Sequence, residues 1–207
     1  SLASMIGHRN KNSRGHIITI EDPIEFIHEH AGCIITQREV GIDTDSFEIA
    51  LKNTLRQAPD VILIGEIRSR ETMDYAIAFA ETGHLVFGTL HTTSAAKTID
   101  RVIDVFPAEE KDMVRAMLSE SLQAVISQTL LKKNGGGRVA AHEIMIGIPA
   151  IRNLVRENKV AQMYSAIQTG ANYGMTTLDQ SLKTLVAKGV ISPQVARNVA
   201  KQPESFL

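Results

Sequence analysis

Three short aliphatic segments of this sequence each end beside a side chain that can take part in acid–base chemistry. The segment IITI is followed by Glu21, Asp22 and Glu25, the segment VILI by Glu66, and the segment LVFGTL by His91. Short aliphatic runs bounded by turn-forming residues predict buried strands. In an open parallel sheet, ligands bind beyond the carboxyl ends of the strands. We therefore expect these side chains to meet along one edge of a sheet.

Carboxylates gathered beside an imidazole suit chemistry on a phosphate. Mg²⁺ takes hard oxygen ligands and usually only one or two carboxylates, the others being water and phosphate oxygens. A further carboxylate can orient or deprotonate an attacking water, while a histidine or arginine meets the charge on the phosphate. An aliphatic strand that ends in an acid is typical of the Walker B segment of NTPases, and here Gly65 stands where an aspartate usually precedes Glu66. The 207 residues contain no GxxxxGK[ST] phosphate-binding loop.

The elements between these strands are predicted from apolar residues spaced three and four apart, which indicate helices. A helix is expected at the start of the chain, loop with at most one short strand over 24–45, and helices over 46–58, 69–82, 94–106 and 109–131. A glycine-rich turn at 132–138 and a strand at 139–146 follow, and then helices at 150–156, 160–169, 177–188 and 193–201. The candidate N-caps of these helices are Asp45 or Ser46, Ser69, Thr93 or Ser94, and Ser192. Strands that alternate with helices predict an α/β fold with a largely parallel sheet, over residues 1–147, and a small all-helical domain over 148–207.

The composition is that of a globular protein and gives little support to several classes of partner. Hydrophobic residues make up 43% and charged residues 22%, with a net charge of −1. Because no basic stripe stands out, neither nucleic acid nor an anionic membrane surface is favoured as a partner. Cys33 alone can form neither an internal disulfide nor a four-cysteine zinc site, which fits a reducing compartment such as the cytoplasm. No apolar run approaches the roughly 20 residues of a membrane span, and no signal peptide pattern is present.

Four motifs in order resemble those of the secretion ATPase superfamily, and in particular the PilT/PilU-type retraction ATPases of type IV pili. ITIEDPIEF resembles the Asp box, VILIGEIR the Walker B strand, ETGHLVFGTLHTTSA the His box, and AIRNLVR a signature of the C-terminal domain. The resemblance implies a RecA-like P-loop NTPase core followed by a helical domain. In that family the P-loop precedes a helix similar to SLASMIGHRN, so we expect the sequence to begin just after it, without the N-terminal domain.

The resemblance also assigns roles to individual residues. Glu66 matches the catalytic glutamate of the Walker B strand, and Glu25 matches the acid of the Asp box. His84 and His91 match the two histidines of the His box, and Arg68 matches an arginine of the Walker B segment. Seven residues of extended strand span roughly 20 Å, so both histidines cannot reach one phosphate. We expect His91 at the γ-phosphate. For His84 we favour packing or a subunit contact over nucleotide binding, for which His84 and Arg68 are both candidates.

By the same resemblance the expected ligands are ATP and Mg²⁺, with Glu66 and Asp22 as candidate metal ligands. The expected assembly is a cytoplasmic homo-hexamer at the inner membrane that drives pilus retraction. Its expected partners are the inner-membrane pilus platform protein and a paralogous motor subunit. The coupling segment consists of Ala150, Ile151, Arg152, Asn153, Leu154 and Arg156.

Two other readings of the sequence stay open. The chain could be a catalytically inactive, oligomer-forming subunit of the pilus motor, since the phosphate-binding loop is not among its residues. A RecA-like motor acting on DNA would need basic loops with aromatic residues for stacking, and a chain with no Trp and three Tyr offers few. The choice between the PilT and PilU types is also open, because the first eighty or so residues look closer to PilU and the remainder to PilT.

Overall fold

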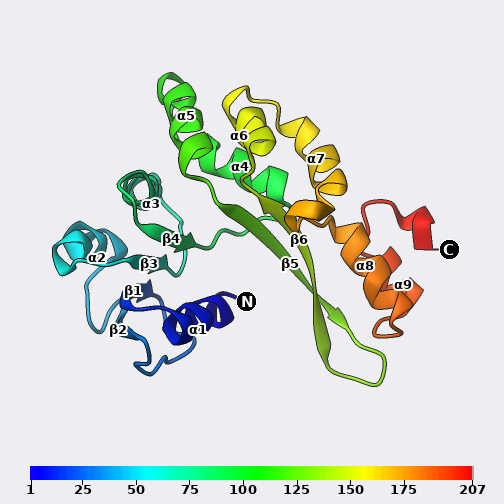
Figure 1. Ribbon diagram of the computed structural model, residues 1–207, viewed down its shortest axis with the longest axis horizontal. Helices are drawn as coiled ribbons and strands as arrows, with labels where there is room; N and C mark the ends of the chain where they lie inside the picture. Colours follow the sequence, from blue (N-terminus) through cyan, green and yellow to red (C-terminus); the bar gives the residue numbers. More distant parts are fainter. Residues whose placement is uncertain (207) are drawn as a thin grey trace. The chain divides into compact units, whose positions relative to one another are not determined.

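A sheet of four parallel strands, in the order β2-β1-β3-β4, forms the centre of the first of two units, Ser1–His91. Figure 1 shows the structure, a computed structural model that describes residues 1–206. The elements of this unit are α1 (Leu2–Asn12), β1 (Gly15–Glu21), β2 (Cys33–Glu39), α2 (Phe47–Thr54), the 3₁₀ turn η1 (Leu55–Gln57), β3 (Val61–Ile64), α3 (Arg70–Glu81) and β4 (Leu85–Gly88). The chain crosses over between parallel strands through α2, which leads from β2 past β1 to β3, and through α3, which leads from β3 to its neighbour β4.

Helices cover both faces of this sheet because β1 and β3 are apolar on both sides. One face buries Ile18, Ile20, Ile62 and Ile64 against apolar side chains of α2 and α3. The opposite face buries Ile17, Val61 and Leu63 together with Ile6 of α1. Burying one such side chain contributes about 1.5–3 kcal/mol, so these two layers dominate the stability of the unit. The predicted α/β architecture with helices on both faces is confirmed.

The helix starts lie where the sequence predicts them. The side chains of Ser46, Ser69 and Ser94 each accept a hydrogen bond from a backbone N–H in the first turn of α2, α3 and α4 (Ala95–Asp104), respectively. Such a cap contributes about 1 kcal/mol and fixes where the chain enters the helix. Gly83, just past α3, has a φ of +95°, which a residue without Cβ adopts without strain.

The second unit, from Thr92 onward, is built on a long antiparallel hairpin of β5 (Ala124–Lys132) and β6 (Arg138–Ile146). Its helices are α4, α5 (Lys111–Ser121), α6 (Pro149–Arg156), α7 (Met163–Thr169), α8 (Leu178–Ala187) and α9 (Pro193–Arg197). Up to residue 206, the unit also has four 3₁₀ turns: η2 (Ala108–Glu110), η3 (Val160–Gln162), η4 (Ala171–Tyr173) and η5 (Pro203–Phe206). None of the helices in the described part of the chain is long and apolar enough to cross a membrane.

The predicted helix over 109–131 is wrong in its second half. Helix α5 ends at Ser121, and Ala124–Lys132 is strand β5. The residues of β5 alternate in exposure, and Ile126 and Leu130 are 40% and 56% exposed. The glycines of the predicted turn have positive φ angles from +74° to +101°, and they reverse the chain between β5 and β6.

The boundary between the two units also differs from the one expected after residue 147. Strand β6 packs with the helices that follow it: the backbone N–H of His142 donates to Ser181 Oγ at 3.2 Å, and Ile144 forms a bridge with Thr176. Leu131 and Ala141 of the hairpin are buried in one cluster with Leu182 and Ile191. The hairpin and the C-terminal helices therefore share a core, and the compact units divide between His91 and Thr92.

Candidate active site

Glu66 lies in the loop directly after β3 and contacts two cationic or potentially cationic side chains. Its Oε1 is 2.7 Å from His91 Nε2, beyond the end of β4, and its Oε2 forms an ion pair with the Arg68 guanidinium. Strands β3 and β4 are parallel neighbours, so the residues that follow them reach the same edge of the sheet. The structure thus brings Glu66, Arg68 and His91 together where the sequence predicted a site.

The electrostatics of this cluster keep Glu66 ionised. The hydrogen bond from Arg68 lowers the pKa of the Glu66 carboxyl below its ordinary value; partial burial acts in the opposite direction, and His91 lowers the pKa further. Glu66 in turn raises the pKa of Arg68, with a smaller contribution from Asp22. A carboxylate can only accept hydrogen bonds, so His91 Nε2 is the donor in its contact with Glu66. The side chain of Glu66 is 18% exposed, whereas those of Arg68 and His91 are 70% and 86% exposed, so both partners can meet a ligand arriving from solvent.

The loop that carries Glu66 is held at both ends. At its start, the N–H of Gly65 donates to Ile20 O at 2.8 Å, and a Cβ at residue 65 would lie 3.1 Å from that same oxygen. The close approach to β1 accounts for glycine at this position. At its end, Glu48 Oε1 accepts hydrogen bonds of 3.3 Å from the hydroxyls of Ser69 and Thr72.

The acids that follow β1 do not all join this cluster. Glu21 accepts hydrogen bonds from Thr19 Oγ1 at 2.8 Å and Gln37 Nε2 at 3.3 Å. Asp22 is exposed and lies near enough to Arg68 to raise its pKa. Glu25 is exposed, and within residues 1–206 it makes no hydrogen bond or ion pair with Glu66, Arg68 or His91. Glu66 and His91 therefore lie in contact, as predicted, whereas Glu25 is hydrogen-bonded to neither of them.

The position of the segment around Glu25 is set by two residues that the sequence did not single out. Glu39 Oε2 accepts a hydrogen bond from Ile24 N at 2.9 Å. Gln37 accepts one from His28 N at 2.8 Å through Oε1 and donates one to Phe26 O at 2.9 Å through Nε2. The signal in the sequence is the polar end of a strand that begins apolar, CIITQRE. Both side chains tie the loop after β1 to the neighbouring strand β2.

His84 is separated from this cluster by the length of β4. It lies just before the strand, where its Nδ1 is 3.0 Å from Phe79 O and 3.2 Å from Thr82 Oγ1. Its ring meets the Phe79 ring edge-on, at a centroid distance of 6.2 Å. These are the contacts of a packing residue at the end of α3. The geometry agrees with the different positions expected for His84 and His91, and it gives no support to nucleotide binding by His84 at the edge that carries Glu66.

The donors at the strand edge are compatible with Mg²⁺ as a partial ligand set. Within the described residues, no three His, Cys, Asp or Glu side chains are grouped so that they could hold a metal ion by themselves. Mg²⁺ does not need such a group, because it keeps several waters and binds through one or two carboxylates plus phosphate oxygens. Glu66 and Asp22 offer that number of hard oxygen donors beside the exposed Arg68.

Comparison with known proteins decides the family. The sequence model described as "Type II/IV secretion system protein" matches residues 1–136. The chain belongs to this family. Residues 1–136 include β1, β3, β4 and the Glu66 cluster, so the match covers the candidate active site of this secretion system protein.

Three similar proteins place the chain more closely within the secretion family. It is 68% identical over 206 residues to the type IV pilus retractation ATPase PilT of Pseudomonas aeruginosa, covering 100% of this chain and 60% of that protein. It is 54% identical over 193 residues to the type IV pilus ATPase PilU of the same organism, covering 93% of this chain and 50% of that protein. A crystal structure of the pilus retraction motor PilT with bound ADP superposes with a TM-score of 0.91 at 50% identity, over 99% of this chain and 58% of that one. The chain thus spans about 50–60% of the length of these relatives.

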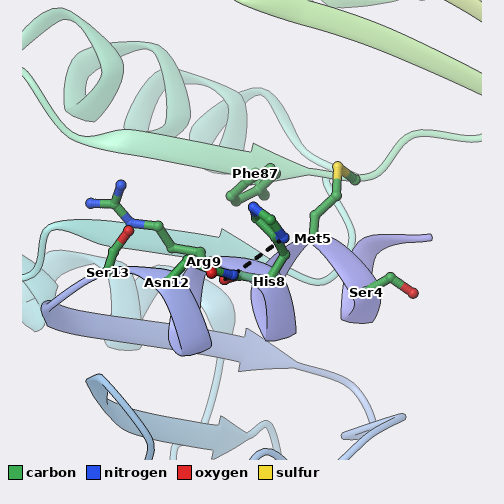
Figure 2. A pocket seen from close by; sticks show the side chains of 7 residues that line it. All are labelled: Ser4, Met5, His8, Arg9, Asn12, Ser13 and Phe87. Atoms are coloured by element: carbon green, nitrogen blue, oxygen red, sulfur yellow. Dashed lines mark hydrogen bonds between the residues drawn. The ribbon is translucent and has the colours of Figure 1, made fainter.

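A shallow depression in the first unit of this secretion system protein is distinct from the cluster around Glu66. It has a volume of about 480 Å³ and is lined by Ser4, Met5, His8, Arg9, Asn12, Ser13 and Phe87. Figure 2 shows Phe87 of β4 and His8 of α1 pointing toward one another across it. The lining contains no carboxylate, so this depression lacks the oxygen ligands through which Mg²⁺ usually binds protein.

The predicted coupling segment forms α6, which buries Ile151 and Val155. The side chain of Arg152 donates from Nε to Gly147 O at 2.6 Å and from Nη1 to Glu120 O near the end of α5. Arg156 forms an ion pair of 2.5 Å with the Glu120 carboxylate. Two arginines of this segment therefore hold α6 against the end of α5.

The remaining residues of the coupling segment differ in their exposure. Ala150 and Asn153 are exposed, and Asn153 Nδ2 donates to Glu157 Oε1 at 3.0 Å, one turn further along the same chain. Leu154 is half-buried. Outward-facing residues of α6, unlike Ile151, are thus available to a partner of the secretion system protein.

Proposed function

We propose that this chain is part of a motor ATPase that powers retraction of type IV pili. The observation that carries the proposal is the contact between Glu66 and His91 at the ends of two adjacent parallel strands. This contact joins the ionised Glu66 carboxylate to the exposed His91 imidazole. The chain is also 68% identical to a protein named as a pilus retractation ATPase. The bound ADP of the similar PilT structure supports nucleotide as the ligand of this edge.

In this proposal Glu66 orients the attacking water and takes its proton. Its pKa is low, so the side chain is a carboxylate at neutral pH, able to accept a hydrogen bond from water. Arg68 holds the other carboxylate oxygen and so limits the directions in which Glu66 can point. Positioning of this kind is most of what a protein contributes to phosphoryl transfer.

The two exposed partners of Glu66 would meet the charge of the terminal phosphate. Arg68 and His91 stand on either side of the carboxylate, and their side chains are largely exposed, so each can turn toward a phosphate at the strand edge. Bound Mg²⁺, held by Glu66 or Asp22 with water and phosphate oxygens, would supply further charge neutralisation there. The loop that cradles the other phosphates would come from residues outside this sequence, because it contains no GxxxxGK[ST] motif.

The proposed assembly is a homo-hexamer in the cytoplasm, peripheral to the inner membrane at the base of the pilus. Helix α6 would carry the motion of the motor to a neighbouring subunit or to the membrane platform protein through its outward residues, Asn153 among them. The likeness to PilU, at 54% identity, also supports a paralogous motor subunit as a partner of the whole protein. Helix α6 would transmit force only if its connection to α5 is firm, and the contacts of Arg152 support such a connection.

The proposal is tested by ATP hydrolysis of the complete protein, with the two His box histidines exchanged separately. We expect His91→Ala to lower kcat by about ten- to a hundredfold, because His91 contacts Glu66 and faces the solvent where the phosphate would lie. His84→Ala should leave kcat within about threefold of the wild type, since its contacts lie at the other end of β4. Hydrolysis that depends on His84 and not on His91 would contradict this site. A complete protein that binds ATP without hydrolysing it would favour an accessory, inactive subunit instead.

A further inference from the structure

Thr89 contacts the backbone on both sides of Glu66. It lies just after β4, where the regular pairing of β3 and β4 ends at the pair Ile64 and Gly88. Its side-chain Oγ1 donates a hydrogen bond to Gly65 O, and its own carbonyl oxygen accepts one from Ile67 N at 3.0 Å. One residue of β4's continuation thus holds the peptide before Glu66 and the peptide after it.

These two hydrogen bonds fix the backbone conformation of Glu66. The orientation of the Gly65–Glu66 peptide sets φ of Glu66, and the orientation of the Glu66–Ile67 peptide sets its ψ. Once φ and ψ are fixed, so is the direction of the Cα–Cβ bond, and hence the region that the carboxylate can reach. Thr89 therefore determines where the Glu66 side chain leaves the backbone.

The same residue links Glu66 to His91. Thr89 precedes His91 by two residues, and His91 Nε2 lies 2.7 Å from Glu66 Oε1. Any shift of the segment after β4 would therefore displace two things together: the hydrogen bonds of Thr89 to the backbone around Glu66, and the His91 imidazole that contacts the Glu66 carboxylate. Gly88 packs against the side chain that follows Glu66, since a Cβ at residue 88 would lie 2.6 Å from Ile67 Cδ1.

We propose that the Thr89 hydroxyl is a positioning group for Glu66, acting through the Gly65 carbonyl. The inference rests on the proposed ATPase function, within which Thr89 acts through the backbone on either side of Glu66. The threonine hydroxyl is the part of Thr89 that substitution can remove, because its backbone carbonyl remains in every variant. Serine keeps the hydroxyl, whereas valine keeps the shape and loses it.

The test compares ATP hydrolysis of the complete protein carrying Thr89→Val, Thr89→Ser or Thr89→Ala. We expect Thr89→Val to lower kcat by about tenfold with KM within about twofold of the wild type, because misdirection of a catalytic group affects the chemical step more than substrate binding. Thr89→Ser should restore kcat to within about twofold. Thr89→Ala loses the same hydroxyl with less side-chain volume and should match Thr89→Val. Thr82→Val is the matched control, since it removes a hydroxyl that bonds Ala78 O and Phe79 O before β4.

A double-mutant comparison separates positioning from general structural damage. If Thr89 acts through Glu66, adding Thr89→Val to Glu66→Gln should cause less than about a twofold further loss of kcat. Wild-type kcat in both Thr89→Val and Thr89→Ala, or a full tenfold further loss in the double variant, would overturn the inference. A wild-type protein without ATPase activity, or one unaffected by Glu66→Gln, would instead refute the proposed function.

Discussion

The two arginines of α6 should differ sharply in what they contribute to stability. Arg152 donates to two backbone carbonyls, Gly147 O and Glu120 O, whereas Arg156 forms an ion pair with the Glu120 carboxylate. Both lie in the same helix and can be replaced by alanine with similar effects on helix propensity. The pair Arg152→Ala and Arg156→Ala therefore isolates the value of the carbonyl contacts.

The structure sets the size of each effect. Glu120 O is one of the last four carbonyls of α5, which have no partner within their own helix, and a cation there also complements the helix dipole. Hydrogen bonds from charged donors contribute about 1.5–3 kcal/mol each, and partial exposure reduces this, so Arg152→Ala should cost about 2 kcal/mol in total. The side chains of Arg156 and Glu120 are 50% and 66% exposed, and exposed ion pairs contribute about 0.2–1 kcal/mol.

Amide hydrogen exchange resolves these effects locally, at the end of α5 and along α6. A loss of 2 kcal/mol lowers protection by about 30-fold, and a loss of 0.5 kcal/mol by about twofold. We expect the first result for Arg152→Ala and the second for Arg156→Ala. Equal losses of protection, or a larger loss for Arg156→Ala, would show that the carbonyl contacts of Arg152 do not hold α6 in place.

Two further predictions concern the first unit. Arg68→Ala should raise the pKa of the Glu66 carboxyl toward its ordinary value, so that an NMR titration finds this group protonating at a higher pH than in the wild type. A carboxyl whose pKa is lowered in the folded state stabilises the fold while it is ionised, and this stabilisation is lost as the carboxyl becomes protonated in acid. The variant should therefore lose less stability than the wild type on acidification. An unchanged titration would contradict the assigned cause. Gly32→Ala should lower the free energy of unfolding by more than about 2 kcal/mol, since its Cβ would lie 2.2 Å from Ser13 O. The control is Gly7→Ala on α1, where a Cβ meets no atom within 4 Å, and it should be neutral or stabilising by up to about 1 kcal/mol. Thermal unfolding of both variants measures the difference.

Much of the first unit could be predicted because its signals are local. The aliphatic run of β3 is buried on both faces, and such runs are bounded in the sequence by glycine, proline and acidic residues. Ser69 caps α3 where its spacing to the apolar residues of the helix predicted it. Since parallel strands end at one edge, the meeting of Glu66 and His91 followed from these elements alone.

Strand β5 could not be predicted from the local sequence pattern. Val125, Ile126 and Leu130 have a spacing that fits a helical face as well as a strand, and only pairing with β6, set by the whole hairpin, decides between them. The separation of Glu25 from the cluster depends in the same way on Gln37 and Glu39, which bind the loop after β1 through contacts between strands.

The role of Thr89 was equally out of reach of the sequence. Its hydroxyl bonds a carbonyl 24 residues earlier in the chain, and no local pattern marks that pairing. Periodicity predicts which residues are buried in a strand, but the hydrogen bonds of the loops that follow the strands depend on the register between strands. The sequence therefore predicted where the candidate site lies, but not the hydrogen bonds that hold its loops in place.

The central claim is that Glu66, held by Arg68 and His91, activates water for ATP hydrolysis, and the direct measurement is kcat of the complete protein carrying Glu66→Gln. The substitution preserves the size of the side chain and removes the charge that accepts the proton. We expect kcat to fall by at least about two orders of magnitude while the affinity for ATP stays within a few-fold of the wild type. A kcat close to that of the wild type would contradict the claim.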